Sequence, residues 1–541
     1  MNTEKTMKKI LTYSIAMLAL ALGASSCTTD DLMVESQTSI TTQFVYSTPE
    51  GLSRAVVGLY PKDRSSATGE AETYSALMMD YCTDLMVFRG GTAAGFARLD
   101  SPTAATGIIE SFWNQLYQII GKANEIIYHA EQLDPTMEND LVRQAYGEAK
   151  CFRARAYFML YQRFERLYLN LIPTTVDNME GRVYRPSSKA EIFAQIKLDL
   201  EDAIKYLDWT APNKDFGRLT KAVAHHIRAQ VAMWEEDWQA AIDNCEAIFE
   251  CPDYGMMPTM ADVFNGPDLR NKEVLYAFQF SNQLGGGCTI TNGIAAGHRL
   301  SLITTARYAK VEGFKECVEY GGYGWGRVYP NTYLFSLYNK EKDNRYSTMF
   351  RHKFYYIDES LLPAGKNIGD EAVFKPAQYM ECMHPHSMKF YDQWTNADDP
   401  TRTTSFKDAI VYRLAETYLM AAEAYFHKDG GASAKALDYY NETYERAMGE
   451  KFTGVLTMQD ILDEYARECH FEGVRWPLLK RLGLLADAVK THSGDSKADD
   501  PNMSSDLIDA RKNWNDKWWR WPIPQSFLDV VGDDYGQNPG W

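Results

Sequence analysis

The sequence lacks an excess of basic residues. Its 541 residues include 56 lysines and arginines against 73 aspartates and glutamates, which gives a formal net charge of −17 at pH 7. A nucleic-acid partner requires a basic surface that faces the phosphate backbone, and peripheral attraction to anionic lipid headgroups requires one as well. The charge balance argues against both, and we expect no nucleic-acid partner.

The sequence also lacks the short motifs that mark common catalytic and nucleotide-binding sites. It contains no G-x-S-x-G, no H-E-x-x-H and no phosphate-binding G-x-x-x-x-G-K. The glycine-rich residues 322–326 have no flanking strand and helix of the kind that a nucleotide-binding loop needs. Asp80 and Asp84 are four residues apart, as two carboxylates on one helix face would be, but an acidic chain contains such pairs by chance. We therefore predict no catalytic residues.

Metal-binding and disulfide patterns are missing too. The histidine pairs His225–His226 and His384–His386 have no cysteine or carboxylate set at ligand spacing, so we expect neither a metal nor a cofactor. Eight of the nine cysteines follow Cys27, and none forms a C-x-x-C. An even number in an exported chain is compatible with disulfides, which leaves the disulfide state open. Because several of these cysteines lie in helical patterns, we predict that most are buried free thiols.

The one long apolar run stands at the N-terminus. Lys5, Lys8 and Lys9 precede the apolar residues 10–22, and small residues 23–26 follow. This run is too short for a permanent membrane span and predicts a signal peptide over residues 1–26. Cys27 follows the small residues as the acylated cysteine of a bacterial lipobox does. We predict that Cys27 carries the lipid and that residues 27–43 are a polar tether.

Helical periodicity dominates residues 44–541. Apolar side chains recur at spacings of three and four over 112–127, 149–164 and 191–207, and Ser188 with Glu191 forms a capping pattern before the third segment. These segments predict a mostly α fold.

Two helix pairs recur along the chain. Residues 220–234 precede 237–249, and residues 412–426 precede 434–447. Both resemble tetratricopeptide repeats, which bury one face by stacking on their neighbours, although an unrelated helical hairpin explains either pair nearly as well.

Residues 267–408 differ from the helical parts. Glycines are frequent there and strand-like pieces such as 274–280 are short, so we predict a loop-rich insertion with short strands between helical repeats. Loops on a rigid scaffold are where binding usually resides.

Several motifs in the C-terminal region, residues 409–541, are characteristic in combination. They are YRLAETYL at 412–419, AEAY at 422–425, RE at 467–468, FEG at 471–473, RW at 475–476, WPIPQ at 521–525 and QNPG at 537–540. With the aromatic helix around FWN at 112–114, they resemble the SusD/RagB family of nutrient-uptake outer-membrane lipoproteins. Pro477 departs from the family pattern, which commonly has an acidic residue there.

The resemblance implies a SusD-like helical fold and a lipid-anchored protein at the cell surface. Such proteins cover a SusC-like TonB-dependent β-barrel transporter as a lid over captured substrate, without enzymatic activity. The expected ligand is an oligosaccharide or polysaccharide, although peptides and other nutrients are compatible with the scaffold. Two alternatives stay open: a structural repeat lipoprotein for protein partners, and a surface glycan hydrolase.

Candidate ligand-binding residues are aromatic and basic side chains within loops. Sugar rings present apolar C–H faces together with hydroxyl groups, which suit such side chains. The candidates are Phe88, Arg89, Phe96, His298, Arg299, Tyr323, Trp325 and Trp394. For each aromatic, packing explains its presence at least as well. We expect Tyr323 or Trp325, with Phe88 or Phe96, to line an exposed concave site, since neighbouring glycines let these rings stand clear of the backbone.

The charged residues of the C-terminal motifs indicate structure rather than chemistry. Bidentate pairing between arginines and carboxylates fixes helix crossings. The residues expected to form this charge network are Arg413, Glu416, Glu423, Arg467, Glu472 and Arg475.

Overall fold

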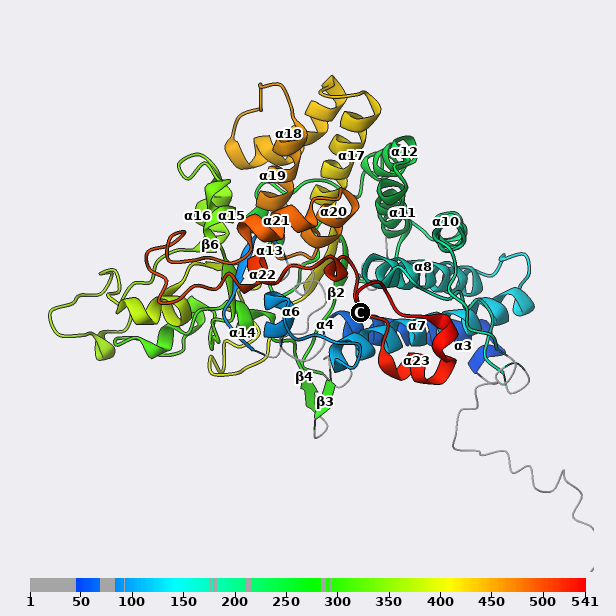
Figure 1. Cartoon of the computed structure of the whole chain (residues 1–541), viewed down its shortest axis with the longest axis horizontal. Coiled ribbons are helices and arrows are strands. Elements are labelled where there is room, and N and C mark those ends of the chain that lie inside the picture. Colours follow the sequence, from blue (N-terminus) through cyan, green and yellow to red (C-terminus); the bar gives the residue numbers. More distant parts are fainter. Residues whose placement is uncertain are drawn as a thin grey trace, which may run out of the picture.

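The computed structural model describes residues 45–68, 83–91, 93–175, 178, 182–209, 216–283, 289–291 and 294–541. Helices predominate among them, which confirms the mostly α fold (Figure 1). The predicted signal peptide, Cys27 and the tether lie outside the described residues. Among the described helices, none combines the length and the apolar character that a membrane span requires.

A continuous stack of helices forms one side of the molecule. Its members are α3 (Pro49–Val57), α4 (Leu59–Thr68), α7 (Gly107–Leu133), α8 (Asp140–Phe164), α10 (Lys189–Tyr206), α11 (Lys221–Glu235), α12 (Trp238–Phe249), α17 (Leu414–Lys428), α18 (Ala434–Met448) and α19 (Met458–Cys469). Each helix from α7 to α12 packs against the next, and α12 packs against α17 (Figure 1). Both predicted helix pairs are therefore present, as α11 with α12 and α17 with α18.

Local sequence explains where these helices begin. At the start of α10 the Ser188 hydroxyl accepts a hydrogen bond from the Glu191 backbone N–H at 3.2 Å, and the Glu191 carboxylate accepts one from the Ser188 N–H at 2.7 Å. The predicted capping box is thus confirmed. On α7 the residues at spacings of three and four, including Phe112, Leu116 and Ile120, are all buried.

Short helices and strands lie within the loop-rich part, residues 267–408, and in the segments that pack against it. The helices are α6 (Ala94–Arg98), α13 (Met260–Phe264), α14 (Leu300–Thr304), α15 (Thr332–Ser336) and α16 (Asn344–Thr348). The strands are β1 (Met86–Phe88), β2 (Val274–Phe278), β3 (Thr289–Thr291), β4 (Ile294–Ala296), β5 (Val328–Pro330), β6 (Phe350–Arg351), β7 (His386–Ser387) and β8 (Ala409–Arg413). They form four antiparallel pairs, β1 with β5, β2 with β8, β3 with β4 and β6 with β7. Because β2 pairs with β8, the two ends of the loop-rich segment lie side by side.

The C-terminal segment runs back across the helical stack. It contains α20 (Arg475–Arg481), α21 (Leu485–His492), α22 (Asp509–Asn513) and α23 (Gln525–Val531). The Trp521 N–H donates to the carbonyl oxygen of Arg163 on α8 at 2.7 Å, and the ring of Phe527 lies 5.1 Å from that of Trp113 on α7. Figure 1 shows α23 beside α7.

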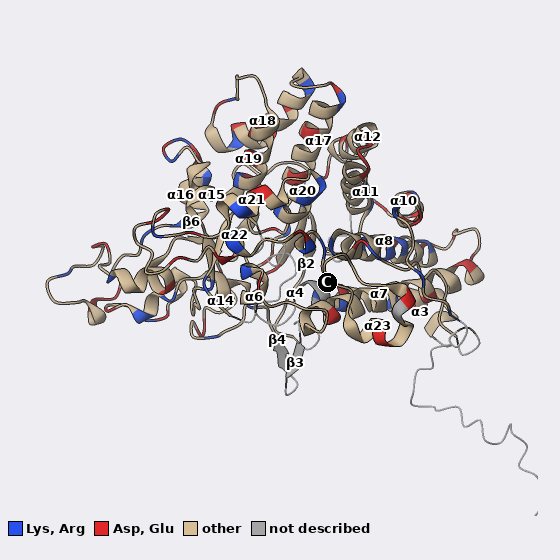
Figure 2. Cartoon of the chain, viewed as in Figure 1, with Lys and Arg blue, Asp and Glu red and all other residues tan. Residues whose placement is uncertain are grey.

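A buried charge network joins β8, α16, α18 and α19. Glu468 is fully buried and accepts hydrogen bonds from Arg413 and Arg345, each at 2.7 Å, and from Arg446. Arg413 also pairs with Glu472 at 2.6 Å. Figure 2 shows acidic and basic residues intermingled over these helices. The predicted network is confirmed around Arg413 and Glu472, and its central member, Glu468, was not in the predicted set.

Of the other predicted members, one joins this network and three pair outside it. Arg467 joins the same network through Glu464, which also binds Arg345. Three residues pair outside it: Glu416 with His226 at 3.3 Å, Glu423 with Arg481 at 2.5 Å and Arg475 with Asp84 at 2.6 Å.

Six described cysteines are free, namely Cys151, Cys245, Cys251, Cys317, Cys382 and Cys469.

Candidate functional site

The glycine-rich segment 321–326 packs closely against neighbouring backbone. A Cβ atom on Gly324 would lie 2.3 Å from the carbonyl oxygen of Ala306, and one on Gly326 would lie 2.3 Å from that of Glu381. Gly326 also has a φ of +55°, a left-handed conformation that favours glycine. These glycines therefore permit close backbone approach, which differs from the role we assigned them of freeing the aromatic rings.

Trp325 is held in place by this packing. Its N–H donates to the carbonyl oxygen of Leu302 at 2.7 Å, and its own carbonyl accepts a hydrogen bond from Arg89 at 3.0 Å. The indole is partly exposed, with the guanidinium groups of Arg299 and Arg327 at 5.8 and 5.6 Å from the ring centroid. A fixed, partly exposed ring with neighbouring cationic donors is suited to contact with an apolar face of a ligand, while the guanidinium groups donate to its hydroxyls.

Further charges adjoin the indole. Arg89 lies 3.9 Å from Glu381, which also contacts Arg307. Burial lowers the pKa of Arg89, as does repulsion from Arg327 and Arg307, while Glu381 opposes the shift. We call Arg89, Arg299, Trp325, Arg327 and Glu381 the Trp325 patch. Sequence reasoning found three of its members and missed Arg327 and Glu381. Arg327 is only two residues from Trp325, whereas nothing in the sequence brings Glu381 there.

Tyr323 is partly exposed and precedes Trp325 by two residues. The structure therefore retains both members of the predicted Tyr323–Trp325 pair as partly accessible aromatics.

Trp394 lies on the wall of a separate groove of about 690 Å³. The groove is also lined by Arg64, Asp268, Arg270 and Asp408, and its volume falls within the usual range for ligand pockets. The indole is partly exposed, and the Lys407 ammonium lies 5.4 Å from its ring centroid. Burial raises the pKa of Asp408 to about 6, against the hydrogen bonds it accepts from the backbone N–H groups of Phe280 and Leu269.

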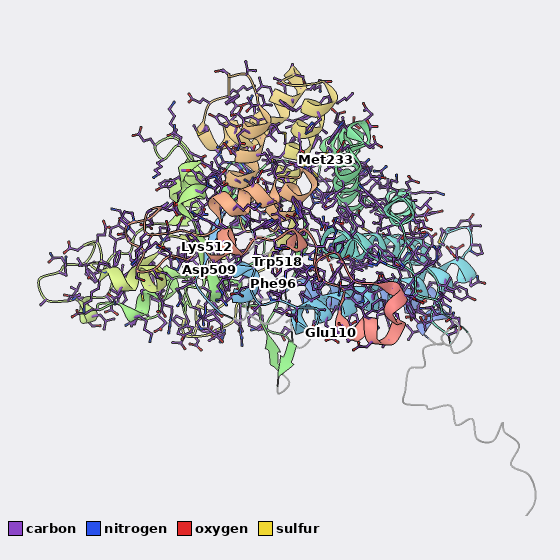
Figure 3. All side chains as sticks on the ribbon, viewed as in Figure 1. Phe96, Glu110, Met233, Asp509, Lys512 and Trp518 are labelled. Carbon is purple, nitrogen blue, oxygen red and sulfur yellow. The ribbon has the colours of Figure 1, made fainter. Side chains whose placement is uncertain are left out.

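Three predicted ligand residues belong to the interior instead. Phe88 is 8% exposed, Phe96 3% and His298 3%. Phe96 packs at 5.4 Å against Trp521, near the middle of the molecule (Figure 3). His298 Nε2 lies 2.7 Å from the Lys407 carbonyl oxygen, and burial lowers its pKa to about 4. The expectation that Phe88 or Phe96 lines an exposed site is wrong, because apolar packing takes up both rings.

Only one of the two carboxylates considered for hydrolysis lies in the described part of the chain. Asp84 is buried and paired with Arg475, and Asp80 lies outside the described residues. Over that same part of the chain, no three histidine, cysteine or acidic side chains come together as a metal site.

Comparison with known proteins identifies the family. The model of the SusD family matches residues 296–541, and a model described as "Starch-binding associating with outer membrane" matches residues 32–231. The chain belongs to the SusD/RagB family. The Trp325 patch and all helices of the stack except α12 and the end of α11 fall within the two matched ranges.

Relatives in the SusD/RagB family are distant in sequence. The chain is 23% identical to SusD-like protein P25 of Formosa agariphila over 71% of this chain and 72% of that one. It is 24% identical to SusD-like protein P2 of the same organism over 87% and 91%. Among solved structures, a laminarin-binding SusD-like protein superposes with a TM-score of 0.70 at 20% identity, covering 91% of this chain and 99% of the other. The SusD-like fold is thereby confirmed.

Proposed function

We propose that this protein is a lipid-anchored, cell-surface glycan-binding protein that serves as the lid of a SusC-like TonB-dependent transporter and does not turn its ligand over. Family membership supports the location, as does the description of one matching family as associating with the outer membrane. A structural relative with the same fold is named for binding laminarin, a glycan, which supports the ligand class.

Trp325 carries the proposal within this chain. Its indole is partly exposed and flanked by two guanidinium groups, and its backbone is anchored on both sides. A sugar ring stacks its C–H face on such an indole, and its hydroxyls accept hydrogen bonds from the arginines. Tyr323 is a second partly exposed aromatic two residues before Trp325, and Trp394 with its polar groove provides a further contact region. No bond-breaking group is required for capture and release.

Binding is tested by screening the purified mature protein on glycan arrays and affinity gels. We expect retention by at least one glycan, reduced in Trp325→Ala. Trp238→Ala is the matched control, because Trp238 is a partly exposed tryptophan that stacks on His427 within the helical stack. Release of reducing ends by pure protein would favour the hydrolase alternative. Equal glycan retention by the wild type and Trp325→Ala would remove Trp325 from the ligand site.

The anchor and the partner are tested in cells. We expect the wild-type protein to fractionate with the outer membrane, to incorporate labelled palmitate and to co-purify with a large β-barrel protein. Cys27→Ala should release soluble protein without the label. If Cys27→Ala stays in the membrane fraction and retains the label, the anchor is elsewhere. Purification without any β-barrel would favour the free scaffold alternative.

A further inference from the structure

A cavity lies where the N-terminal and C-terminal halves of the helical stack meet. It has a volume of about 120 Å³ and is lined by residues of α8, α11, β8, α17, α19 and α20. Met233, labelled in Figure 3, belongs to its α11 wall. Gln162, Trp234 and Pro477 line it and are partly exposed, which gives it a route to solvent. It is roomy enough for a small ion together with water.

Charged residues line this cavity, and most of them are paired. Arg155 pairs with Asp63 and Arg481 with Glu423, while Glu416 lies by His226 and Glu472 by Arg413. Arg163 is the exception within the described residues. Among the described residues no carboxylate forms an ion pair with its guanidinium, although the residue is only 3% exposed.

The residues around Arg163 accept hydrogen bonds from only part of its guanidinium. Its Nη1 donates to the Met159 carbonyl oxygen one helical turn earlier, at 3.1 Å, and its Nε has no acceptor among the described residues. The guanidinium lies 4.2 Å from the ring centroid of Phe112. Burial lowers its pKa to about 9, and repulsion from Arg155 adds to the shift. A buried cation of this kind is costly unless an anion compensates it.

A second hydrogen-bond donor beside the cavity also lacks an acceptor among the described residues. Tyr465 on α19 also lines the cavity, is 3% exposed, and its hydroxyl has no hydrogen-bond partner in the described chain. Buried polar groups are normally satisfied by protein or by bound species. One uncompensated cation and two unused donors, the Nε–H and the O–H, therefore border a single cavity.

We propose that this cavity binds a small monovalent anion of chloride size, held by Arg163 and Tyr465. The anion supplies the missing negative charge and accepts the two unused hydrogen bonds. The site is distinct from the Trp325 patch and does not depend on the proposed glycan binding. Because the Arg163 carbonyl also accepts the Trp521 N–H, the anion stabilises the contact between α8 and the C-terminal segment.

Crystals soaked in sodium bromide test the site directly. We expect an anomalous peak inside the cavity within hydrogen-bonding distance of Arg163 and Tyr465. Density of water in its place, with no anomalous signal at high bromide, would overturn the proposal.

A solution test compares melting temperatures in sodium chloride and in sodium gluconate at equal ionic strength, since gluconate is too large for the cavity. We expect the melting temperature to rise by about 1–2 °C per tenfold increase of chloride above gluconate. Arg163→Met should abolish this difference and Tyr465→Phe should reduce it. Arg143→Met, which removes a partly exposed cation from the same helix, should keep it.

The anion site can be tested even if Arg163→Met does not fold, because Tyr465→Phe and the wild type give independent results. Tyr465→Phe keeps the ring and removes only the hydroxyl, so a full chloride effect together with an unchanged bromide peak in this variant would exclude Tyr465 from the site. Equal melting curves for the wild type in chloride and gluconate would contradict anion binding altogether.

Discussion

Arg475 and Asp84 join two parts of the chain that are 391 residues apart in sequence. The Nε and Nη2 groups of Arg475 donate to the two carboxylate oxygens of Asp84 at 2.9 and 2.6 Å, and both side chains are buried. Arg475 opens α20, whereas Asp84 lies just before β1, which leads directly to Arg89. This bidentate pair therefore ties the C-terminal motif region to the strand that precedes the Trp325 patch.

Removing one partner of this pair should be costly. In Arg475→Met, Asp84 is left buried without a counter-ion, so we expect the free energy of unfolding to fall by about 3–5 kcal/mol. The double variant Asp84→Asn with Arg475→Met should recover part of that loss. Urea unfolding measures both. If the double variant loses as much free energy of unfolding as Asp84→Asn and Arg475→Met lose together when made singly, the two residues act independently.

Glu468 should give the protein a characteristic sensitivity to acid. Burial raises the pKa of Glu468, but Arg446, Arg413 and Arg345 overcome this and hold it well below its ordinary value. The unfolded chain takes up a proton as the pH falls through about 4.3, while the folded protein does not, so the free energy of unfolding falls as the pH falls.

The variant Glu468→Gln removes this titration. We expect it to lower the free energy of unfolding by about 3–5 kcal/mol at pH 7 and to flatten the dependence on pH below about 4.5. Urea titrations at a series of pH values test this. Glu235→Gln, which breaks a partly exposed pair with Lys197, serves as the control and should change little. An unchanged slope in Glu468→Gln would refute the assignment.

Truncation of Trp325 should weaken ligand binding more than folding. A stacking aromatic contributes about 1–2 kcal/mol, so Trp325→Ala should lose about five- to thirty-fold in glycan affinity. Paired calorimetry and melting curves separate the two roles. A steep fall in melting temperature, with unchanged affinity of the folded fraction, would place Trp325 in the core.

Phe96 should behave in the opposite way. Its ring is buried against Trp521, so Phe96→Ala leaves a cavity and should lower the free energy of unfolding by about 3–5 kcal/mol. Glycan affinity of the folded fraction should stay within about twofold of the wild type. A stable variant with lost affinity would return Phe96 to the ligand site.

Much of the helical scaffold was predictable because its signals are local. The helix expected over 191–207 is α10, Lys189–Tyr206, and the strand expected over 274–280 is β2, Val274–Phe278. Periodicity and capping depend on residues within a few positions of each other, and such patterns survive in a single sequence.

The candidate site was harder to predict because it depends on distant contacts. Phe96 and Trp325 both stand near glycines, yet the first packs against Trp521 and the second is partly exposed. Glu381 belongs to the Trp325 patch because it contacts Arg89 and Arg307, which lie far from it in the sequence. No local sequence pattern indicates these contacts. Burial of a loop aromatic is decided by which remote segment covers it, and the sequence contains no sign of that.

The pairing of β2 with β8 has a consequence for how this protein diversifies. Helices α12 and α17 pack directly, although the whole segment that carries Trp325 and Trp394 is inserted between them. Since the segment leaves and re-enters through adjacent antiparallel strands, residues added or lost inside it do not alter the spacing of the two helices. The ligand surface proposed above can therefore change in sequence and in length while the packing of the helical stack stays the same.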